Sequence, residues 1–176
     1  MITRAIKHKI GFVILGIGLL GGTATLVRGV EDGVVRMESE ILEVVTLKGP
    51  EHVFGSHVNV PRTARLVSRK TADSAGFETL LRVTDAYEAP EPRRHGQARI
   101  KEGDLTLSRV RTIINEIPGV SDFEETVDFR LPLDKVPQGA DLTIELISDT
   151  GDNRTFTLPA RYLDMQRRAI SRENGR

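Results

Sequence analysis

The first pattern in the chain is an uncharged stretch of 18 residues, Ile10–Val27. At about 1.5 Å per residue, a helix of this length spans about 27 Å, which is enough to cross the hydrocarbon core of a bilayer. We therefore predict a transmembrane helix over residues 10–29. The cations Arg4, Lys7 and Lys9 precede the stretch, and acidic residues follow it closely. The positive-inside rule then places the N-terminus, residues 1–9, in the cytoplasm and the rest of the chain outside.

The same stretch also fits a secretory signal peptide, which has a basic start, a short apolar centre and small residues before the cleavage site. Met1–Lys9, Ile10–Leu20 and Gly22–Ala24 could fill these three roles. The apolar pattern continues past Ala24 through Leu26 and Val27, and this continuation favours a retained anchor. The cleaved signal stays open as the alternative.

Small residues recur along one face of the predicted helix. They are Gly11, Gly18, Gly22, Thr25 and Gly29. In lipid there is little hydrophobic force between helices, so close packing on small residues drives their association. The spacing predicts a face that docks against other transmembrane helices of a complex. The alternative is that glycine is simply frequent in membrane spans.

Beyond the predicted helix, the pattern becomes that of short strands with period-two alternation, separated by turn residues. The clearest predicted strands are Phe77–Tyr87, Glu125–Leu133, Asp141–Ser148 and Arg154–Leu158. The last two form a predicted hairpin around the loop Asp149–Asn153, with Phe156 and Leu158 facing inward. Weaker strands are expected at Val53–Val60, Thr63–Arg69, Gln97–Lys101 and Asp104–Glu116. For Asp104–Glu116 a helix is the alternative, but its β-branched residues favour a strand. Val34–Lys48 is ambiguous between helix and strand, and its second half favours a strand.

Seven or eight short strands at regular spacing indicate an antiparallel β-sandwich. The stretch LPLDKVPQGADLTIEL, residues 131–146, resembles the closing strands of immunoglobulin-like extracytoplasmic domains. This resemblance implies a fold and carries no functional residues. The predicted fold class is mainly β. A single transmembrane helix is followed by an immunoglobulin-like sandwich over residues 30–160 and by a short basic C-terminal tail or helix over residues 161–176.

The predicted tail is rich in arginine, with Arg161, Arg167, Arg168 and Arg172 among its residues. A basic segment of this kind can contact an acidic partner surface or anionic lipid headgroups. We expect these four arginines to contact a partner, and the alternative is a solvated tail. A periplasmic position favours a protein partner over lipid.

Composition narrows the possible chemistry. Lys+Arg and Asp+Glu both total 25, so the net charge is zero, which argues against a nucleic-acid binder. The chain has no cysteine, so it has no disulfide and no thiol nucleophile. His52 and His57 are five residues apart, which places them on opposite faces of a strand. No phosphate-binding, dinucleotide-binding or zinc-protease motif occurs. We expect no catalytic residue, metal, cofactor or small-molecule substrate.

These observations predict a non-catalytic, single-pass subunit of the bacterial inner membrane, with its C-terminal domain in the periplasm. It would stabilise or bridge a larger complex. An accessory role in a photosynthetic or respiratory assembly is favoured, and secretion machinery is also possible. The alternative is a membrane-anchored periplasmic binding module for a peptide, a glycan or a soluble redox partner.

Overall fold

The computed structural model describes residues 25–31, 33–39, 41–57, 59–88, 92, 94–118 and 122–176, and for Thr25–Glu31 it describes the backbone. The strands of these residues are β1 (Thr25–Glu31), β2 (Val34–Ser39), β3 (Val44–Lys48), β4 (His52–His57), β5 (Val60–Thr71), β6 (Glu78–Glu88), β7 (His95–Ile100), β8 (Leu105–Leu107), β9 (Arg109–Glu116), β10 (Asp122–Arg130), β11 (Leu142–Ser148) and β12 (Arg154–Leu158). Two 3-10 turns, η1 (Lys101–Gly103) and η2 (Leu133–Lys135), and one helix, α1 (Ala160–Asn174), complete the described elements. The prediction of a mainly β, antiparallel protein is confirmed.

The predicted transmembrane helix lies mostly outside the described residues. Its last five residues, Thr25–Gly29, belong instead to β1, which pairs antiparallel with β2 from Thr25 opposite Ser39. This end of the prediction is therefore wrong. Threonine and valine favour extended backbone, and the β2 ladder supplies hydrogen-bond partners that sequence periodicity cannot reveal. Among the described residues, no helix has the length and apolarity needed to cross a bilayer.

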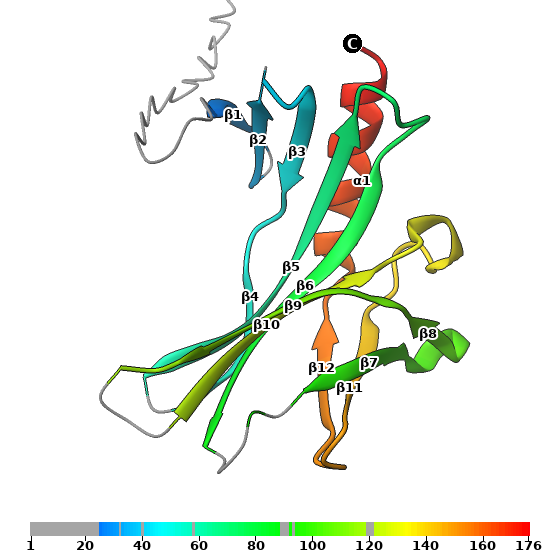
Figure 1. The fold of residues 1–176 in the computed structure, drawn as a ribbon. Coiled ribbons are helices and arrows are strands. Elements are labelled where there is room, and N and C mark those ends of the chain that lie inside the picture. Colours follow the sequence, from blue (N-terminus) through cyan, green and yellow to red (C-terminus); the bar gives the residue numbers. More distant parts are fainter. Residues whose placement is uncertain are drawn as a thin grey trace, which may run out of the picture.

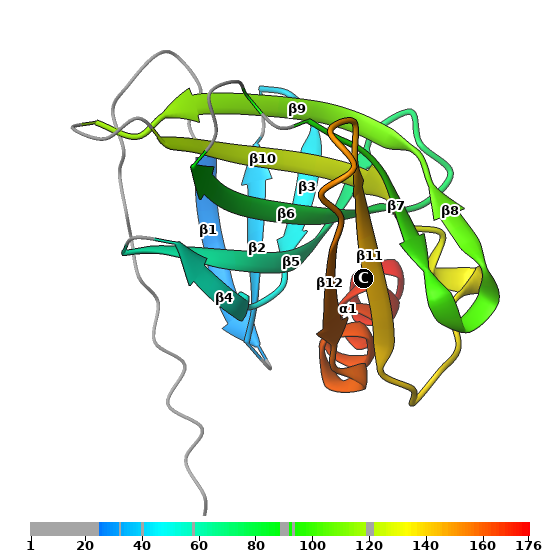
Figure 2. The ribbon, with the colours of Figure 1, turned by 90° about the horizontal axis from the view of Figure 1, so that it is seen from below.

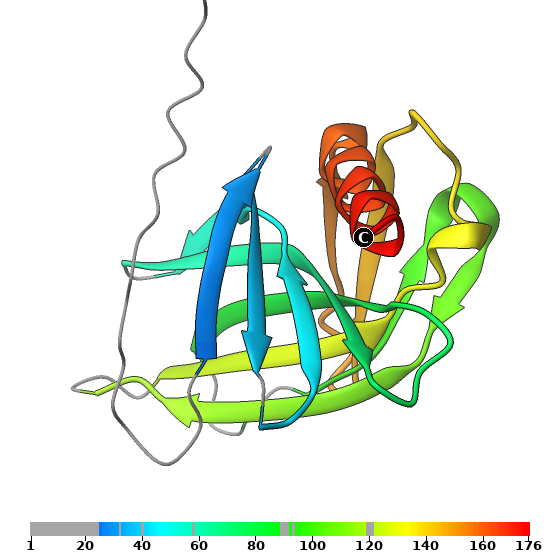
Figure 3. The same cartoon turned by 90° about the horizontal axis from the view of Figure 1, so that it is seen from above.

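The strands form two antiparallel sheets (Figure 1). The larger sheet has eight strands in the order β1-β2-β3-β5-β6-β10-β9, and β4 also pairs with β5. β5 is 12 residues long, so its first half pairs with β4 and its second half with β3. The smaller sheet has the order β12-β11-β7-β8. In Figures 2 and 3, β1, β2 and β3 run across β5, β6, β10 and β9, so the larger sheet is strongly twisted.

The arrangement is sandwich-like, but it differs from the immunoglobulin pattern that the sequence led us to expect. An immunoglobulin domain divides seven to nine strands between two sheets of similar size. Here the hairpin β1–β2 and strand β3 extend one sheet to eight strands, while the other has four. The resemblance of residues 131–146 rested on one short local pattern, which covers the β10–β11 connection and most of β11. Such a pattern does not specify the order of strands in the sheets.

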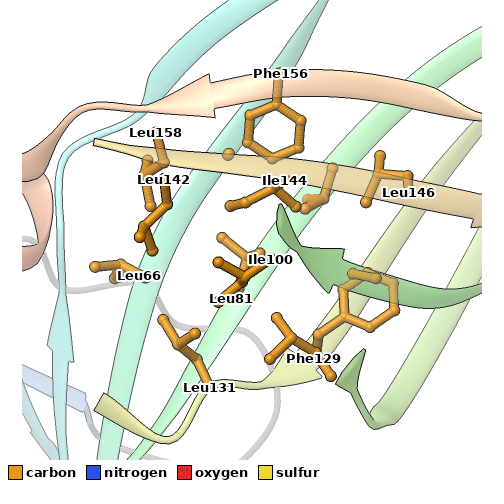
Figure 4. Packing of buried hydrophobic residues seen from close by; sticks show 14 of the residues in the cluster. Leu66, Leu81, Ile100, Phe129, Leu131, Leu142, Ile144, Leu146, Phe156 and Leu158 are labelled. Atoms are coloured by element: carbon orange, nitrogen blue, oxygen red, sulfur yellow. The ribbon is translucent and has the colours of Figure 1, made fainter. Parts of the chain in front are cut away.

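The core lies between the two sheets, where alternate residues of neighbouring strands face one another (Figure 4). Leu81 and Phe129 of the larger sheet are fully buried against Ile144 and Leu158 of the smaller one. Each fully buried side chain of this kind contributes roughly 1.5–3 kcal/mol. Phe156 is also buried, as the hairpin pattern predicts, and it stacks on Phe54 with ring centroids 4.2 Å apart.

The helix α1 completes the fold, so residues 161–176 are not a tail separate from the β-domain. Leu163 belongs to the common core, and α1 contacts β2, β3 and β5. Gln166 is fully buried, and its amide Nε2 donates to the carbonyl of Leu47 at 3.1 Å and to Ser68 Oγ at 2.7 Å. At the start of the helix, Asp141 Oδ1 accepts the backbone N–H of Ala160 at 2.8 Å.

Candidate functional site

The structure describes only two of the five residues on the glycine face of the predicted membrane helix. Gly11, Gly18 and Gly22 lie outside the described residues. Thr25 and Gly29 lie in strand β1, so they cannot belong to a helix-packing face. The prediction for these two residues is corrected because the backbone there is extended, and residues four apart in a strand do not recur with a helical period.

The four arginines predicted to contact a partner do not all lie on the same face of α1. Arg167 points inward, where its Nη2 donates to the carbonyls of Val136 at 2.7 Å and Leu133 at 3.0 Å. These bonds hold α1 against the connection between β10 and β11. Arg167 is therefore a structural residue, which sequence composition alone could not separate from its neighbours.

Arg161, Arg168 and Arg172 are exposed and lie on the face of α1 opposite Leu163. Their spacing of seven and four residues places them in one row, because a helix repeats every 3.6 residues. The Arg161 guanidinium also lies over the Tyr162 ring, 5.2 Å from its centroid. Three long cationic side chains thus form one row, which we call the arginine row of α1.

A groove runs along the inner side of α1, beneath the arginine row. Its volume is about 640 Å³, and it is lined by Phe77, Leu133 and Ile170 together with the ion pair Arg130–Glu78. In that pair Arg130 Nε lies 2.6 Å from Glu78 Oε1. A groove of this size with mostly apolar walls can hold a short peptide segment or a small ligand.

A buried charged cluster, whose residues the sequence pattern did not single out, lies at the other end of the core. His95, Asp85 and Glu125 are each 0 to 1% exposed. His95 Nε2 lies 2.9 Å from Asp85 Oδ2 and 3.8 Å from Glu125 Oε2, and the His95 backbone N–H donates to Glu125 Oε1 at 3.1 Å. The cluster joins β6 and β10 of the larger sheet to β7 of the smaller one.

Two arginines neutralise this cluster. Arg154 Nε lies 2.7 Å from Asp85 Oδ2, and Arg62 Nε lies 2.9 Å from Asp85 Oδ1. Burial alone would raise the pKa of Asp85, but the hydrogen bond with His95 and the charges of Arg154 and Arg62 lower it below the ordinary value. Burial raises the pKa of Glu125, and the negative charge of Asp85 adds to this effect.

The carboxylate of Asp85 in this cluster is already paired with two arginines. Among the described residues, no group of three or more His, Asp or Glu side chains is arranged to hold a metal ion. The arginines occupy the space next to Asp85 that a cation would need. We interpret the cluster as a structural ion-pair network that joins the two sheets.

Two residues of this cluster, Asp85 and Glu125, could have been recognised from the sequence. Asp85 continues the inward row Leu81 and Val83 along β6, and Glu125 continues the inward row Phe129 and Val127 along β10. A carboxylate at an inward position of an alternating strand indicates a buried polar partner. The predicted strand that becomes β7 begins only at Gln97, so the alternation leaves His95 in a loop and does not identify it as that partner.

Comparisons of the chain with protein-family models, with curated proteins and with solved structures found no match.

Proposed function

We propose that this chain is a non-catalytic protein of the bacterial envelope whose β-domain lies in the periplasm and binds an acidic protein partner through α1. The arginine row carries this proposal. Arg161, Arg168 and Arg172 project from the outward face, while Arg167 and Gln166 fasten the same helix to the sheets. A rigid helix that presents cations in a fixed row favours a partner with a complementary acidic surface.

A lipid surface is a poorer partner for this face. Helices that lie on membranes combine cations with large apolar residues that enter the acyl region. The outward face of α1 has Asp164 and Met165 between its arginines. Met165 is also close to the β1–β2 turn, because a Cβ added at Gly33 would lie 2.9 Å from Met165 Cε. The face therefore offers charge without an apolar surface.

The start of β1 bears on how the chain reaches the periplasm. With Thr25 already in a strand, the uncharged stretch before the domain is reduced to residues 10–24. A helix of this length spans about 22 Å, which is shorter than a usual transmembrane helix. The small residues Gly22–Ala24 then stand directly before the folded domain, as in a cleaved signal peptide. This favours cleavage over a retained anchor, and either form leaves the domain in the periplasm.

The mass of the protein purified from the bacterial envelope distinguishes these two forms. We expect a chain that begins near Thr25. A chain that retains residues 1–24 and resists alkaline extraction from the membrane would restore the single-pass interpretation, and the acidic-partner proposal would then be tested on that form.

The partner proposal is tested by the charge-reversal variant R161E/R168E/R172E. We expect the wild-type protein to migrate in native electrophoresis of envelope extracts as part of a larger complex, and the variant to migrate as the free chain. The matched control K101E/R111E/K135E makes the same change in charge on exposed residues of other elements, and it should stay in the complex. Equal loss in both variants, or none in either, would reject the arginine row as the contact surface.

The groove beneath α1 favours a second candidate function, that of a periplasmic binding module. Its volume of about 640 Å³ and its combination of apolar and charged side chains suit a peptide segment. A wild-type protein that migrates only as the free chain would favour this candidate over the first.

A further inference from the structure

Four cations share one face of the larger sheet, on strands that lie side by side. Lys48 of β3 is opposite Val67 of β5, which puts it between Arg65 and Arg69 on the same face of that strand. Arg65 is directly opposite Arg82 of β6. Like charges in directly opposite positions destabilise a sheet, so this arrangement has a cost that the fold must offset.

Only part of this charge is neutralised by the described residues. Asp128 accepts two bonds from Arg82, with Nε at 2.7 Å and Nη2 at 2.8 Å, and Glu51 pairs with Arg65. Glu78 of β6 is directly opposite Arg69, but its carboxylate pairs with Arg130 at 2.6 Å. Within the part of the chain that the structure describes, neither Lys48 nor Arg69 forms an ion pair with a carboxylate. Burial and the charges of Arg65, Arg82 and Arg69 lower the pKa of Lys48. The face therefore has two cations available for an anion.

A cavity of about 380 Å³ opens beside these two cations. Lys48 and Arg69 line it, and so do the apolar side chains of Met37, Leu42 and Val44. Glu38 also lines the cavity, and its carboxylate pairs with Arg36 Nη1 at 2.9 Å. Val44 and Lys48 share a face of β3, so at about 3.3 Å per residue they are roughly 13 Å apart. Leu42, in the turn before β3, is 61% exposed. The cavity thus has a cationic part near Lys48 and an apolar part near Leu42.

We infer that this cavity binds an anionic amphiphile, a single carboxylate or phosphate headgroup attached to an alkyl chain. The headgroup would lie between Lys48 and Arg69, and the chain would extend over Val44 towards Leu42. A small polar anion would leave the apolar walls in water, and an uncharged alkyl compound would leave the two cations without a partner. The inference is independent of the arginine row of α1, which lies on another surface of the protein.

Calorimetric titration of the purified protein tests this inference. If the purified protein retains residues 1–24, it is titrated in zwitterionic nanodiscs. The probes are octanoate and octyl phosphate, and the controls are acetate, inorganic phosphate and octanol. We expect both alkyl anions to bind about tenfold or more tightly than each control, since a hydrogen bond to a charged group is worth roughly one tenfold step or more. Equal affinity for octanol and octanoate would overturn the inference that Lys48 and Arg69 bind the anionic headgroup.

Two variants separate the parts of the cavity. Lys48→Met keeps an unbranched apolar side chain and should weaken octanoate binding by about tenfold. Leu42→Ser, at an exposed position, should weaken octanoate binding and leave the weak binding of acetate unchanged. The control Lys70→Met removes a lysine from the other face of the neighbouring strand, where its Nζ lies 5.9 Å from the Phe77 ring centroid. If this control weakens octanoate binding as much as Lys48→Met, the proposed site is wrong.

Discussion

At the scale of single residues, the cluster around His95 shows how neighbouring groups control ionisation. Asp85 and Glu125 are both fully buried and both face His95. The pKa of Asp85 is lowered, although burial opposes this, because His95, Arg154 and Arg62 stabilise its charged form. The pKa of Glu125 is raised because burial prevails there. Two carboxyl groups on one imidazole thus have opposite effects on the pH dependence of stability.

Glu125→Gln should make the folded protein less sensitive to rising pH. With a raised pKa in the folded state, Glu125 keeps its proton at pH values where the unfolded chain has lost it. The wild-type protein therefore loses stability as pH rises from the ordinary value of 4.5 through the raised one. Denaturant unfolding at a series of pH values should show that the variant lacks this loss.

Asp85→Asn provides the contrasting case. The lowered pKa of Asp85 contributes stability that is present at neutral pH and is lost as pH falls through that pKa. The variant should lose about 3–5 kcal/mol of unfolding free energy at neutral pH, because it leaves Arg62 and Arg154 without their charged partner. A loss below about 1 kcal/mol would mean that the network contributes little to the fold.

At the scale of elements, α1 has two faces with different roles. The inner face carries Leu163, Gln166 and Arg167, whose contacts are with the sheets and with the β10–β11 connection. The outer face carries the arginine row. The sequence predicted a basic segment with helical character here, but the composition of the segment does not separate the two faces. The separation depends on which side of the helix the sheets cover.

Arg167→Ala and Arg168→Ala should differ although the two residues are adjacent. Arg167→Ala removes the donors to the Leu133 and Val136 carbonyls, and it should cost about 1.5–3 kcal/mol of unfolding free energy. Arg168→Ala changes an exposed side chain and should stay within about 0.5 kcal/mol of the wild type. Denaturant unfolding measures both. Similar values for the two variants would contradict the assignment of Arg167 as structural.

At the scale of the whole molecule, the two sheets and α1 share a single core, which includes Leu163 of the helix. The helix covers the part of the larger sheet that the smaller sheet leaves uncovered, as Figures 1 and 3 show. Gly49 of the β3–β4 connection lies under it, since a Cβ added there would be 3.1 Å from Gln166 Oε1. The C-terminal segment is therefore needed to close the domain.

Truncation after Pro159 should destabilise the protein by more than the roughly 1.5–3 kcal/mol that burial of Leu163 alone contributes. The variant also uncovers Leu47 and loses the two bonds of Gln166. Thermal unfolding followed by circular dichroism measures the change. The control, truncation after Asn174, removes two exposed residues beyond α1 and should unfold like the full chain. A stable domain without α1 would contradict the shared core.

The amino-acid sequence by itself determined the strands of the C-terminal third and the inward direction of Phe156 and Leu158. Alternation along a strand depends only on local geometry and on which residues avoid water. Tertiary structure decided the rest. It placed Thr25 in a strand, added β1, β2 and β3 to one large sheet, and turned Arg167 inward. It also gathered His95, Asp85 and Glu125 in one cluster and Lys48 and Arg69 in one cavity, because contacts between distant strands depend on pairing order and register.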